Sequence, residues 1–146
     1  MPARYLELEV TESVMQTKGD LKIFAHIKKL GVKIAIDDFG TGYSSLSSLK
    51  ELPLDCLKID RSFVQDLLYN SQTPVLLGTI ISLSNAMGYK LVAEGVETID
   101  QVLVMSGLGC QTIQGYYFSK PVPADEVPAL VKKDFKLDSA VANRLL

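Results

Sequence analysis

The sequence predicts an α/β fold made of parallel strands joined by helices. Five short segments are rich in Ile, Val, Leu or Tyr and end at polar or glycine residues, which is typical of strands. Stretches with helical spacing of apolar residues separate them. Because strand and helix alternate, the strands are expected to pair in parallel through crossover connections. A closed eight-stranded barrel needs about 250 residues, so the 146 residues of this chain fit an open sheet or part of a barrel.

The predicted strands are spread along the whole chain. They are expected at Tyr5–Val10, Val32–Asp37, Cys56–Asp60, Lys90–Ala93 and Thr112–Phe118. A first helix is indicated between the first two strands by apolar residues at near-helical spacing, with Gly31 in the position of a C-cap. Those apolar residues are Leu21, Phe24, Ile27 and Leu30.

The later helices carry signals at their ends. Thr73 suits an N-cap, and Gly88 stops the apolar stripe that follows it. Thr98 and Gln101 have the spacing of a capping box at the start of the next helix. A last helix is predicted from Ala124 to about Lys133, after two prolines.

Composition limits the classes of protein that fit. A chain with 47% hydrophobic and 22% charged residues can form one globular domain, expected at residues 1–133 with a tail at 134–146. No apolar run approaches the roughly 18 residues of a membrane-spanning helix, so this segment is expected to make no membrane contact. The net charge of −2 disfavours a nucleic-acid duplex as partner. Cys56 and Cys110 lack metal-binding spacing, which is typical of reduced cysteines in the cytoplasm.

Acidic side chains recur where the predicted strands end. The carboxyl ends of parallel strands form one rim, and active sites of α/β folds lie on that rim. Five consecutive strands therefore bring their last residues to one place. These residues are Glu9, Glu12, Asp37, Asp38, Lys58, Asp60, Glu94, Glu97 and Gln114.

Clustered carboxylates indicate a cation at this rim. Such carboxylates repel one another unless a cation or a proton lies between them. Oxygen ligands without His or Cys favour Mg²⁺, Mn²⁺ or Ca²⁺. The adjacent Asp37 and Asp38 suit two bridged ions about 3.5–4 Å apart, which activate a water for attack on a phosphodiester. This geometry requires the strand to end or bulge there, because successive strand residues face opposite sides. Lys58 would hold the water or neutralise developing charge.

Each group also has an ordinary structural explanation. Glu12 can cap a turn, Asp37 and Asp38 can form a turn before Gly40, and Lys58 can extend to solvent. Acids near the start of a helix are favoured by the helix dipole. The joint occurrence at five strand ends is what favours a functional site.

Five motifs together resemble the EAL family of cyclic-di-GMP phosphodiesterases, whose domains are modified TIM barrels. The matching stretches occur in the family's order and at similar spacing. They are residues 6–13 (LELEVTES), 36–46 (IDDFGTGYSSL), 57–60 (LKID), 92–97 (VAEGVE) and 114–121 (QGYYFSKP). The resemblance implies that the fold is the C-terminal part of a TIM-like (β/α)8 barrel that lacks its first strands.

The resemblance also implies roles for individual residues. Glu9 is similar to a direct metal ligand, and Asp37 to the ligand that bridges two Mg²⁺ or Mn²⁺ ions. Asp38 is similar to a ligand of the second ion. Lys58 resembles the lysine that contacts the nucleophilic water, and Glu94 resembles an acid that binds the second metal or its water.

A second set of residues is similar to the parts of the family's site that support the ligands. Glu12 resembles the acid that anchors the loop after Asp38, and that loop begins with Phe39, Gly40, Thr41 and Gly42. The segment 39–46 resembles a loop that couples metal binding, catalysis and dimer contacts. Glu97 and Gln114 match supporting polar positions of the site.

The expected activity is hydrolysis of cyclic di-GMP to linear pGpG. The family's Glu-Ala-Leu motif and an Asn ligand would lie before Met1, so the chain alone is expected to be inactive. A non-catalytic module that binds cyclic di-GMP or dimerises is the alternative. A third possibility, an aldolase-like lyase, requires Lys58 as a Schiff-base amine, and neighbouring acids that keep the amine protonated argue against it.

A partial barrel is also expected to self-associate. Five strands leave two edges unpaired, and they expose the face that would line the inside of a barrel. We expect this apolar inner face to include Leu6, Leu8, Ile34, Ile36, Leu57 and Val92. A two-fold dimer would cover it.

Overall fold

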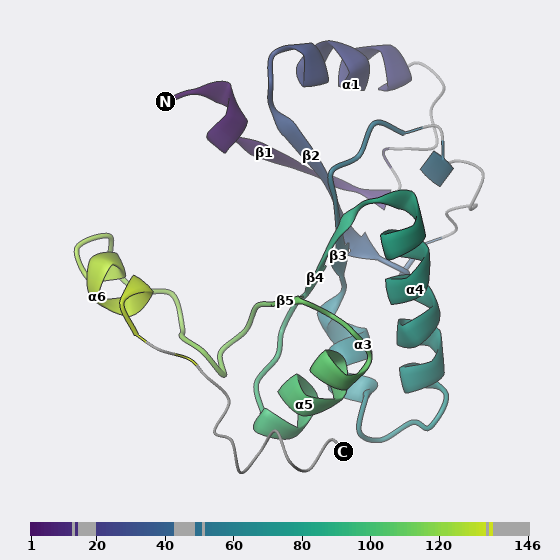
Figure 1. Ribbon diagram of the computed structural model, residues 1–146, viewed down its shortest axis with the longest axis vertical. Coiled ribbons are helices and arrows are strands. Elements are labelled where there is room, and N and C mark those ends of the chain that lie inside the picture. Colours follow the sequence, from purple (N-terminus) through teal and green to yellow (C-terminus); the bar gives the residue numbers. More distant parts are fainter. Residues whose placement is uncertain (13, 15–19, 43–48, 51, 134, 136–146) are drawn as a thin grey trace.

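The computed structural model describes residues 1–12, 14, 20–42, 49–50, 52–133 and 135. Five strands form one sheet in the order β1-β2-β3-β4-β5, and every neighbouring pair is parallel. Chain order and sheet order therefore coincide, as expected for consecutive βα repeats (Figure 1). The strands are β1 (Glu7–Thr11), β2 (Lys33–Phe39), β3 (Cys56–Ile59), β4 (Lys90–Ala93) and β5 (Thr112–Ile113).

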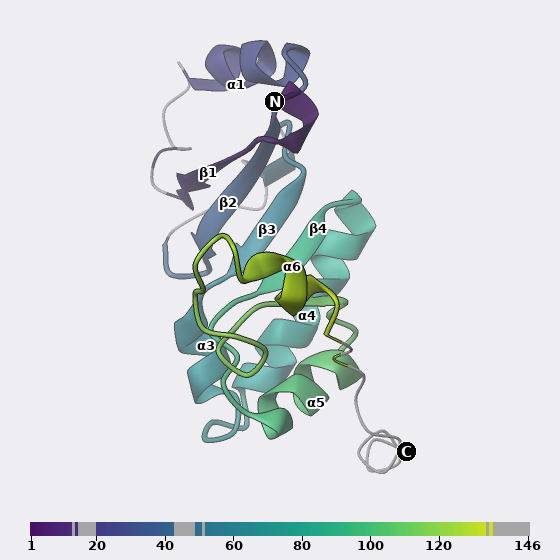
Figure 2. The same ribbon diagram turned by 90° about the vertical axis from the view of Figure 1, so that its left-hand side faces the viewer.

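The helices lie on different sides of this sheet. In Figures 1 and 2, α4 runs along one side of the sheet, whereas α6 lies on the other side. A short 3-10 turn, η1 (Ala3–Tyr5), precedes β1. The described helices are α1 (Asp20–Lys29), α3 (Arg61–Asp66), α4 (Thr73–Met87), α5 (Ile99–Gly107) and α6 (Val127–Val131).

The predicted strands are present, with shifts at their ends. The first strand begins at Glu7, because η1 occupies the residues before it. The second extends to Phe39 through an irregular step. The fifth stops at Ile113 rather than Phe118, since Gln114 begins a turn whose backbone bonds to Val96.

The helix end signals are mostly confirmed. Gly88 takes the left-handed conformation (φ 73°) that a C-cap glycine permits, and Thr98 and Gln101 form a reciprocal capping box. Thr73 is not the N-cap of α4, because Gln72 occupies that position and Thr73 donates its hydroxyl hydrogen bond to Asp66.

Two helices differ from the sequence-based expectation. α6 covers only Val127–Val131 of the expected Ala124–Lys133. Its proline lies at one of the first two helical positions, where the missing N–H costs least, and residues 124–126 before the helix form a turn closed by the hydrogen bond from Glu126 N–H to the Pro123 carbonyl. Helix α3 was not predicted. It begins after Asp60, whose side chain accepts a hydrogen bond from the Ser62 backbone N–H.

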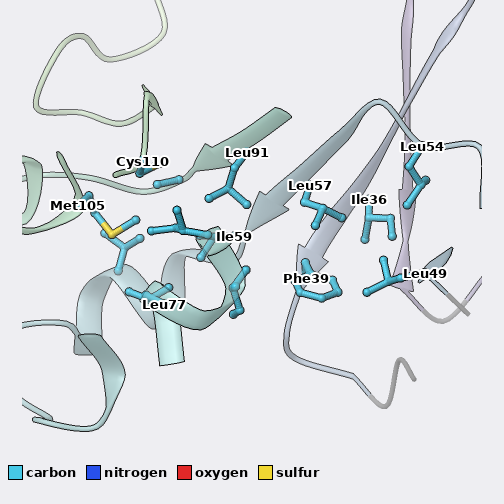
Figure 3. Close-up of a cluster of buried hydrophobic side chains, with 14 of the residues drawn as sticks. Ile36, Phe39, Leu49, Leu54, Leu57, Ile59, Leu77, Leu91, Met105 and Cys110 are labelled. Atoms are coloured by element: carbon cyan, nitrogen blue, oxygen red, sulfur yellow. The ribbon is translucent and has the colours of Figure 1, made fainter. Parts of the chain in front are cut away.

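The hydrophobic core lies between the sheet and helices α3, α4 and α5. Leu57 and Ile59 on β3 are fully buried, and they belong to the same cluster as Leu77 on α4 and Met105 on α5. Figure 3 shows these side chains gathered on one side of the strands. Their burial removes most of the apolar strand surface from water, which is the main driving force for folding.

The inner-face prediction is therefore wrong for the three central residues. Ile34, Ile36 and Leu57 are 0% exposed and pack under helices, so they lie on the outer, covered face. The error came from the alternation of strand side chains, which leaves the choice of face open. Leu8 on β1 aligns with Ile34 and so lies on the same face, although it is 41% exposed at the edge of the described sheet, and Leu6, which is 43% exposed, precedes β1.

The opposite face of the sheet carries the polar chemistry. Strand register aligns Glu9 with Ala35, and Lys58 with Val92. Aligned residues share a face, and so do residues two positions apart on one strand. Glu9, Asp37 and Lys58 therefore point away from the core. The expected tail at 134–146 lies outside the described residues except for Phe135.

No helix in the described residues is long and apolar enough to cross a membrane.

We expect the covered face to dominate stability. Leu57→Ala should lower the free energy of unfolding by about 2–5 kcal/mol, because it leaves a cavity under the helices. Leu68→Ala is the control: Leu68 is 44% exposed after α3, and its truncation should cost about 1 kcal/mol or less. Urea unfolding followed by circular dichroism measures both. Equal losses would contradict the packing of Leu57 under the helices.

Candidate functional site

Lys58 is the centre of the polar rim. Its side chain extends from β3 and only 7% of the residue is exposed. The Nζ atom lies 2.7 Å from Glu9 Oε1 on β1 and 2.8 Å from Glu94 Oε1 at the end of β4. It also lies 3.2 Å from Asp37 Oδ1 on β2. One ammonium thus contacts carboxylates from three other strands.

The carboxylates keep this ammonium charged. Burial by itself favours the neutral amine, but the interactions with Glu9, Glu94 and Asp37 outweigh burial and raise the pKa of Lys58 above its ordinary value. Lys58 in turn offsets the repulsion among three acids held at one rim. The four side chains form one electrostatic unit.

A bulge in β2 separates the two adjacent aspartates. Between the pairs Ile36–Leu57 and Phe39–Ile59, β2 has one residue more than β3. Asp38 takes a φ of 53° at this point, a conformation that Asp tolerates better than most residues. Asp37 can then face Lys58 while Asp38 faces a neighbouring cavity. The sequence-based interpretation of a shared site required the strand to end or bulge at these aspartates, and β2 does bulge there.

One carboxylate oxygen of Asp37 could accept a further hydrogen bond or bind a cation. Its Oδ1 is buried and receives no hydrogen bond among the described residues, although it is within ion-pair distance of Lys58. A buried carboxylate oxygen in this state is suited to an additional cation or donor.

A small cavity adjoins Lys58 on the rim. It has a volume of about 220 Å³ and lies where β2, β3, β4 and β5 end. Four of its nine lining residues are acidic, and one, Arg61 at the start of α3, is basic. The other lining residues are Asp38, Asp60, Glu94, Gly95, Glu97, Gln114, Gly115 and Tyr116.

Two acids in this cavity share a hydrogen bond. Desolvation, followed by the charge of Asp37 and the hydrogen bond with Asp60, raises the pKa of Asp38. Burial opposes ionisation of Asp60, but hydrogen bonds from Ser62 outweigh it and lower the pKa of Asp60. The pKa values of the two carboxyl groups therefore shift in opposite directions, and Asp38 is the weaker acid of the pair.

Glu12 holds the segment that follows β2. It is 5% exposed, and its Oε2 accepts hydrogen bonds from the backbone N–H groups of Gly40 (3.2 Å) and Gly42 (3.1 Å). Gly40 has a φ of 99°, so a residue with a Cβ would be strained there. The Thr41 hydroxyl donates to the Asp38 carbonyl. The ring of Phe39 is buried in the core, which fixes the start of this segment.

The ends of β4 and β5 are joined through their backbones. Gln114 N–H donates to the Ala93 carbonyl at 2.8 Å, and Val96 N–H donates to the Gln114 carbonyl at 3.1 Å. A Cβ on Gly115 would lie 2.0 Å from the Val96 carbonyl oxygen, so only glycine permits this approach. Glu94, Glu97 and Gln114 are thereby brought to the same cavity.

The donor set fits a hard divalent cation in its chemistry. All of the acids at the rim offer oxygen, and no His or Cys lies among the residues that contact Lys58 or line the cavity. Within the described part of the chain, however, no three such side chains are arranged to hold an ion. Lys58 stands between Glu9, Asp37 and Glu94, so an ion must compete with the ammonium for these carboxylates.

The structure thus gathers the predicted site residues in two connected places. Glu9, Asp37, Lys58 and Glu94 form the ion-pair unit, which Glu94 joins to the cavity. Asp38, Glu97 and Gln114 line that cavity, and Glu12 secures residues 40–42. The expected loop is described only as far as Gly42, so residues 43–46 lie outside the described residues.

Sequence reasoning gave no role to two residues that line the cavity. It placed Asp60 at the rim, and Asp60 follows β3 there as the N-cap of α3. Arg61 follows it at the start of the unpredicted α3. Without that helix, nothing in the pattern directs Arg61 to the rim.

Comparison with known proteins connects this geometry to a family. The sequence profile of the EAL domain matches residues 1–121. Cyclic di-GMP phosphodiesterase NbdA of Pseudomonas aeruginosa is 39% identical over 148 aligned residues, which span all of this chain and 19% of NbdA. MucR of the same organism, a bifunctional diguanylate cyclase/cyclic di-GMP phosphodiesterase, is 44% identical over 129 residues, or 87% of this chain and 19% of MucR.

Solved structures show the same fold. The MucR phosphodiesterase in complex with c-di-GMP superposes with a TM-score of 0.82 at 43% identity, covering 87% of this chain and 52% of that one. Klebsiella pneumoniae BlrP1 in a manganese/cy-diGMP complex gives a TM-score of 0.78 at 32% identity, over 83% of this chain and 31% of BlrP1. The chain therefore spans about a fifth of the curated relatives and about half of the MucR phosphodiesterase chain.

Proposed function

This chain belongs to the EAL domain family, and on that premise we propose that it supplies the carboxyl-terminal strands of a site that hydrolyses cyclic di-GMP to linear pGpG. The observation that carries the proposal is the contact of Lys58 with carboxylates from three other strands of one rim. NbdA and MucR, which are named as cyclic-di-GMP phosphodiesterases, support the reaction and its substrate. The parallel sheet corresponds to the TIM-barrel-like fold of EAL domains.

Two divalent ions, Mg²⁺ or Mn²⁺, are the proposed cofactors. Glu9, Asp37, Asp38 and Glu94 would hold them, and the buried Oδ1 of Asp37, which accepts no hydrogen bond among the described residues, suits an additional ligand contact. When bound, such ions lower the pKa of a water and stabilise the leaving oxygen of a phosphodiester. The manganese complex of BlrP1 supports this choice of metal.

The residues of the chain itself would orient the reacting groups. Lys58, already protonated and held by Glu9 and Glu94, would hold the attacking water by donating hydrogen bonds. Glu94 reaches both Lys58 and the cavity, so it would accept a proton from that water. Glu97 and Gln114 would position polar groups of the substrate at the cavity wall, and Glu12 would fix the segment after β2.

Two other functions were open from the sequence. The lyase possibility is disfavoured, because a Schiff-base amine must lose its proton and the raised pKa of Lys58 opposes that loss. A non-catalytic module that binds cyclic di-GMP or dimerises would use the same rim without turnover. Measurement of hydrolysis separates these two cases. The buried, reduced Cys56 and Cys110 support a cytoplasmic setting.

We also propose that the isolated chain self-associates. β1 is an edge strand of the described sheet, with Leu6 and Leu8 about two-fifths exposed. α4 contains no charged residue and exposes Val75 (71%) and Leu76 (45%) to solvent. Unpaired edges and exposed apolar surface favour association.

Catalysis is expected once the chain is preceded by the first part of an EAL domain, for example that of MucR. Asp37→Asn, Lys58→Ala and Glu94→Gln should each lower kcat by about 10²-fold or more in the presence of Mn²⁺. Glu126→Gln is the matched control, because Glu126 is exposed and makes no capping bond at α6. Chromatography of the product pGpG measures the rate. Undiminished turnover in Glu94→Gln would remove that residue from catalysis.

Metal binding by the 146-residue chain alone should be weak. Lys58 already neutralises Glu9, Asp37 and Glu94, so an ion must displace it before it can bind all three. We expect calorimetric titration with Mn²⁺ to show at most one weak site that is lost in Asp37→Asn. Two tight sites in the isolated chain would contradict this expectation.

Self-association is tested by light scattering after gel filtration. We expect a dimer at micromolar concentration, because association would cover the exposed edge strand and the uncharged face of α4. Replacing Val75 with Lys should shift the population towards monomer, whereas Ser71→Lys on the nearby exposed surface should not. A monomer that melts cooperatively would refute the proposal.

A further inference from the structure

The segment that carries Glu94 is fixed by hydrogen bonds along its whole length. We call residues 94–98, between β4 and α5, the acid loop. Glu94 N–H donates to the Ile59 carbonyl of β3. Val96 N–H donates to the Gln114 carbonyl, and the Val96 carbonyl accepts from Tyr117 N–H at 3.0 Å. The backbone of the acid loop is thus bound to both neighbouring strand ends.

Gln101 supplies the remaining bonds of the acid loop. Its Oε1 accepts hydrogen bonds from the backbone N–H groups of Glu97 (2.8 Å) and Thr98 (3.1 Å). Its Nε2 donates to the Val64 carbonyl of α3 at 3.2 Å. The carboxamide therefore joins α5, the acid loop and α3. A capping box accounts for the bond to Thr98 but not for the bonds to Glu97 and Val64.

Because Gln101 is buried, loss of these hydrogen bonds would be costly. Gln101 is 3% exposed, and Val64 is fully buried. A buried carboxamide is costly unless its donors and acceptors are bonded. Any shift of the acid loop away from Gln101 would leave buried polar groups unpaired, so the loop has one favoured position relative to α3.

Close packing fixes the same position from the other side. Gly95 has a φ of 71°, and a Cβ placed on it would lie 2.5 Å from Cβ of Arg61. Gln65 of α3 donates to the Gly95 carbonyl at 2.8 Å. The loop is therefore in direct contact with the first turn of α3, which follows β3 and Lys58. Helix α3 is thus connected to the strand that carries Lys58 and packs against the loop that carries Glu94.

We propose that Gln101 is a positioning residue for the Glu94 carboxylate. It holds the acid loop against α3, and this sets the 2.8 Å contact between Glu94 and Lys58. Gln101 touches neither Lys58 nor the carboxylate and acts only through the loop. For its effect on metal binding, the inference rests on the proposed function of Glu94.

Two substitutions separate positioning from stability. Gln101→Met removes all three hydrogen bonds of the side chain while keeping its length and much of its volume. Gln101→Glu keeps an acceptor for Glu97 and Thr98, and thus the capping box, but removes the donor to Val64. Gln72→Met is the matched control, since Gln72 is exposed at the start of α4 and its side chain makes no capping bond.

The first measurement is Mn²⁺ affinity of the 146-residue chain, determined from free Mn²⁺ by electron paramagnetic resonance well below the melting temperature. Outer residues that orient a ligand change metal affinity by about tenfold or more. We expect a loss of that size in Gln101→Met, a smaller loss in Gln101→Glu and none in Gln72→Met. A residue with a purely structural role would lower the melting temperature and leave the affinity of the folded chain unchanged.

The second measurement needs no metal. Crystal structures of the variants should show the Glu94–Lys58 contact lengthened in Gln101→Met and kept in Gln72→Met, and amide exchange at Glu97 and Thr98 should rise in the former. If the wild-type chain binds no Mn²⁺, the metal proposal fails, and this contact alone decides the role of Gln101. An unchanged contact in folded Gln101→Met or, if that variant does not fold, in Gln101→Glu would overturn the inference.

Discussion

The interaction on which the candidate site depends is the pairing of one buried lysine with carboxylates from three other strands. Glu9, Asp37 and Glu94 come from different βα repeats, and without a cation between them they would repel one another. Lys58 makes their approach possible and remains charged because they surround it. The sheet must keep its register at all four strands for this unit to form, so site geometry and strand pairing are coupled.

Two departures from regular structure adapt the rim to this unit. The bulge in β2 turns two consecutive aspartates to different neighbours, so that Asp37 meets Lys58 and Asp38 meets Asp60. The close approach of Gly115 to Val96 ties the ends of β4 and β5 together. The bulge thus changes the facing of two adjacent acids on one strand, and the close approach brings residues beyond two strand ends together.

Two segments beside the site are held in place by hydrogen bonds. The acid loop is held by Gln65, Gln101 and the backbone of residue 114, and the segment after β2 is held by Glu12. Buried amides and carboxylates are costly groups to place in a core. Their hydrogen bonds offset that cost, and the same bonds fix the positions of the acid loop and of residues 40–42. Lys58 reduces the net negative charge of the site, and a divalent cation would reduce it further.

The sequence by itself determined the order and type of the strands, most helix ends and the set of acids at the rim. These follow from local rules: apolar spacing, caps such as Thr98 with Gln101, and the convergence of parallel strand ends. Only the tertiary structure decided which strand face is covered, because alternation gives Leu57 and Lys58 opposite sides without saying which side meets helices. It also decided the partners of Lys58 and the links of Gln101 to Val64. Those contacts join residues that are between 21 and 49 positions apart in the sequence, and no local pattern encodes pairings over such separations.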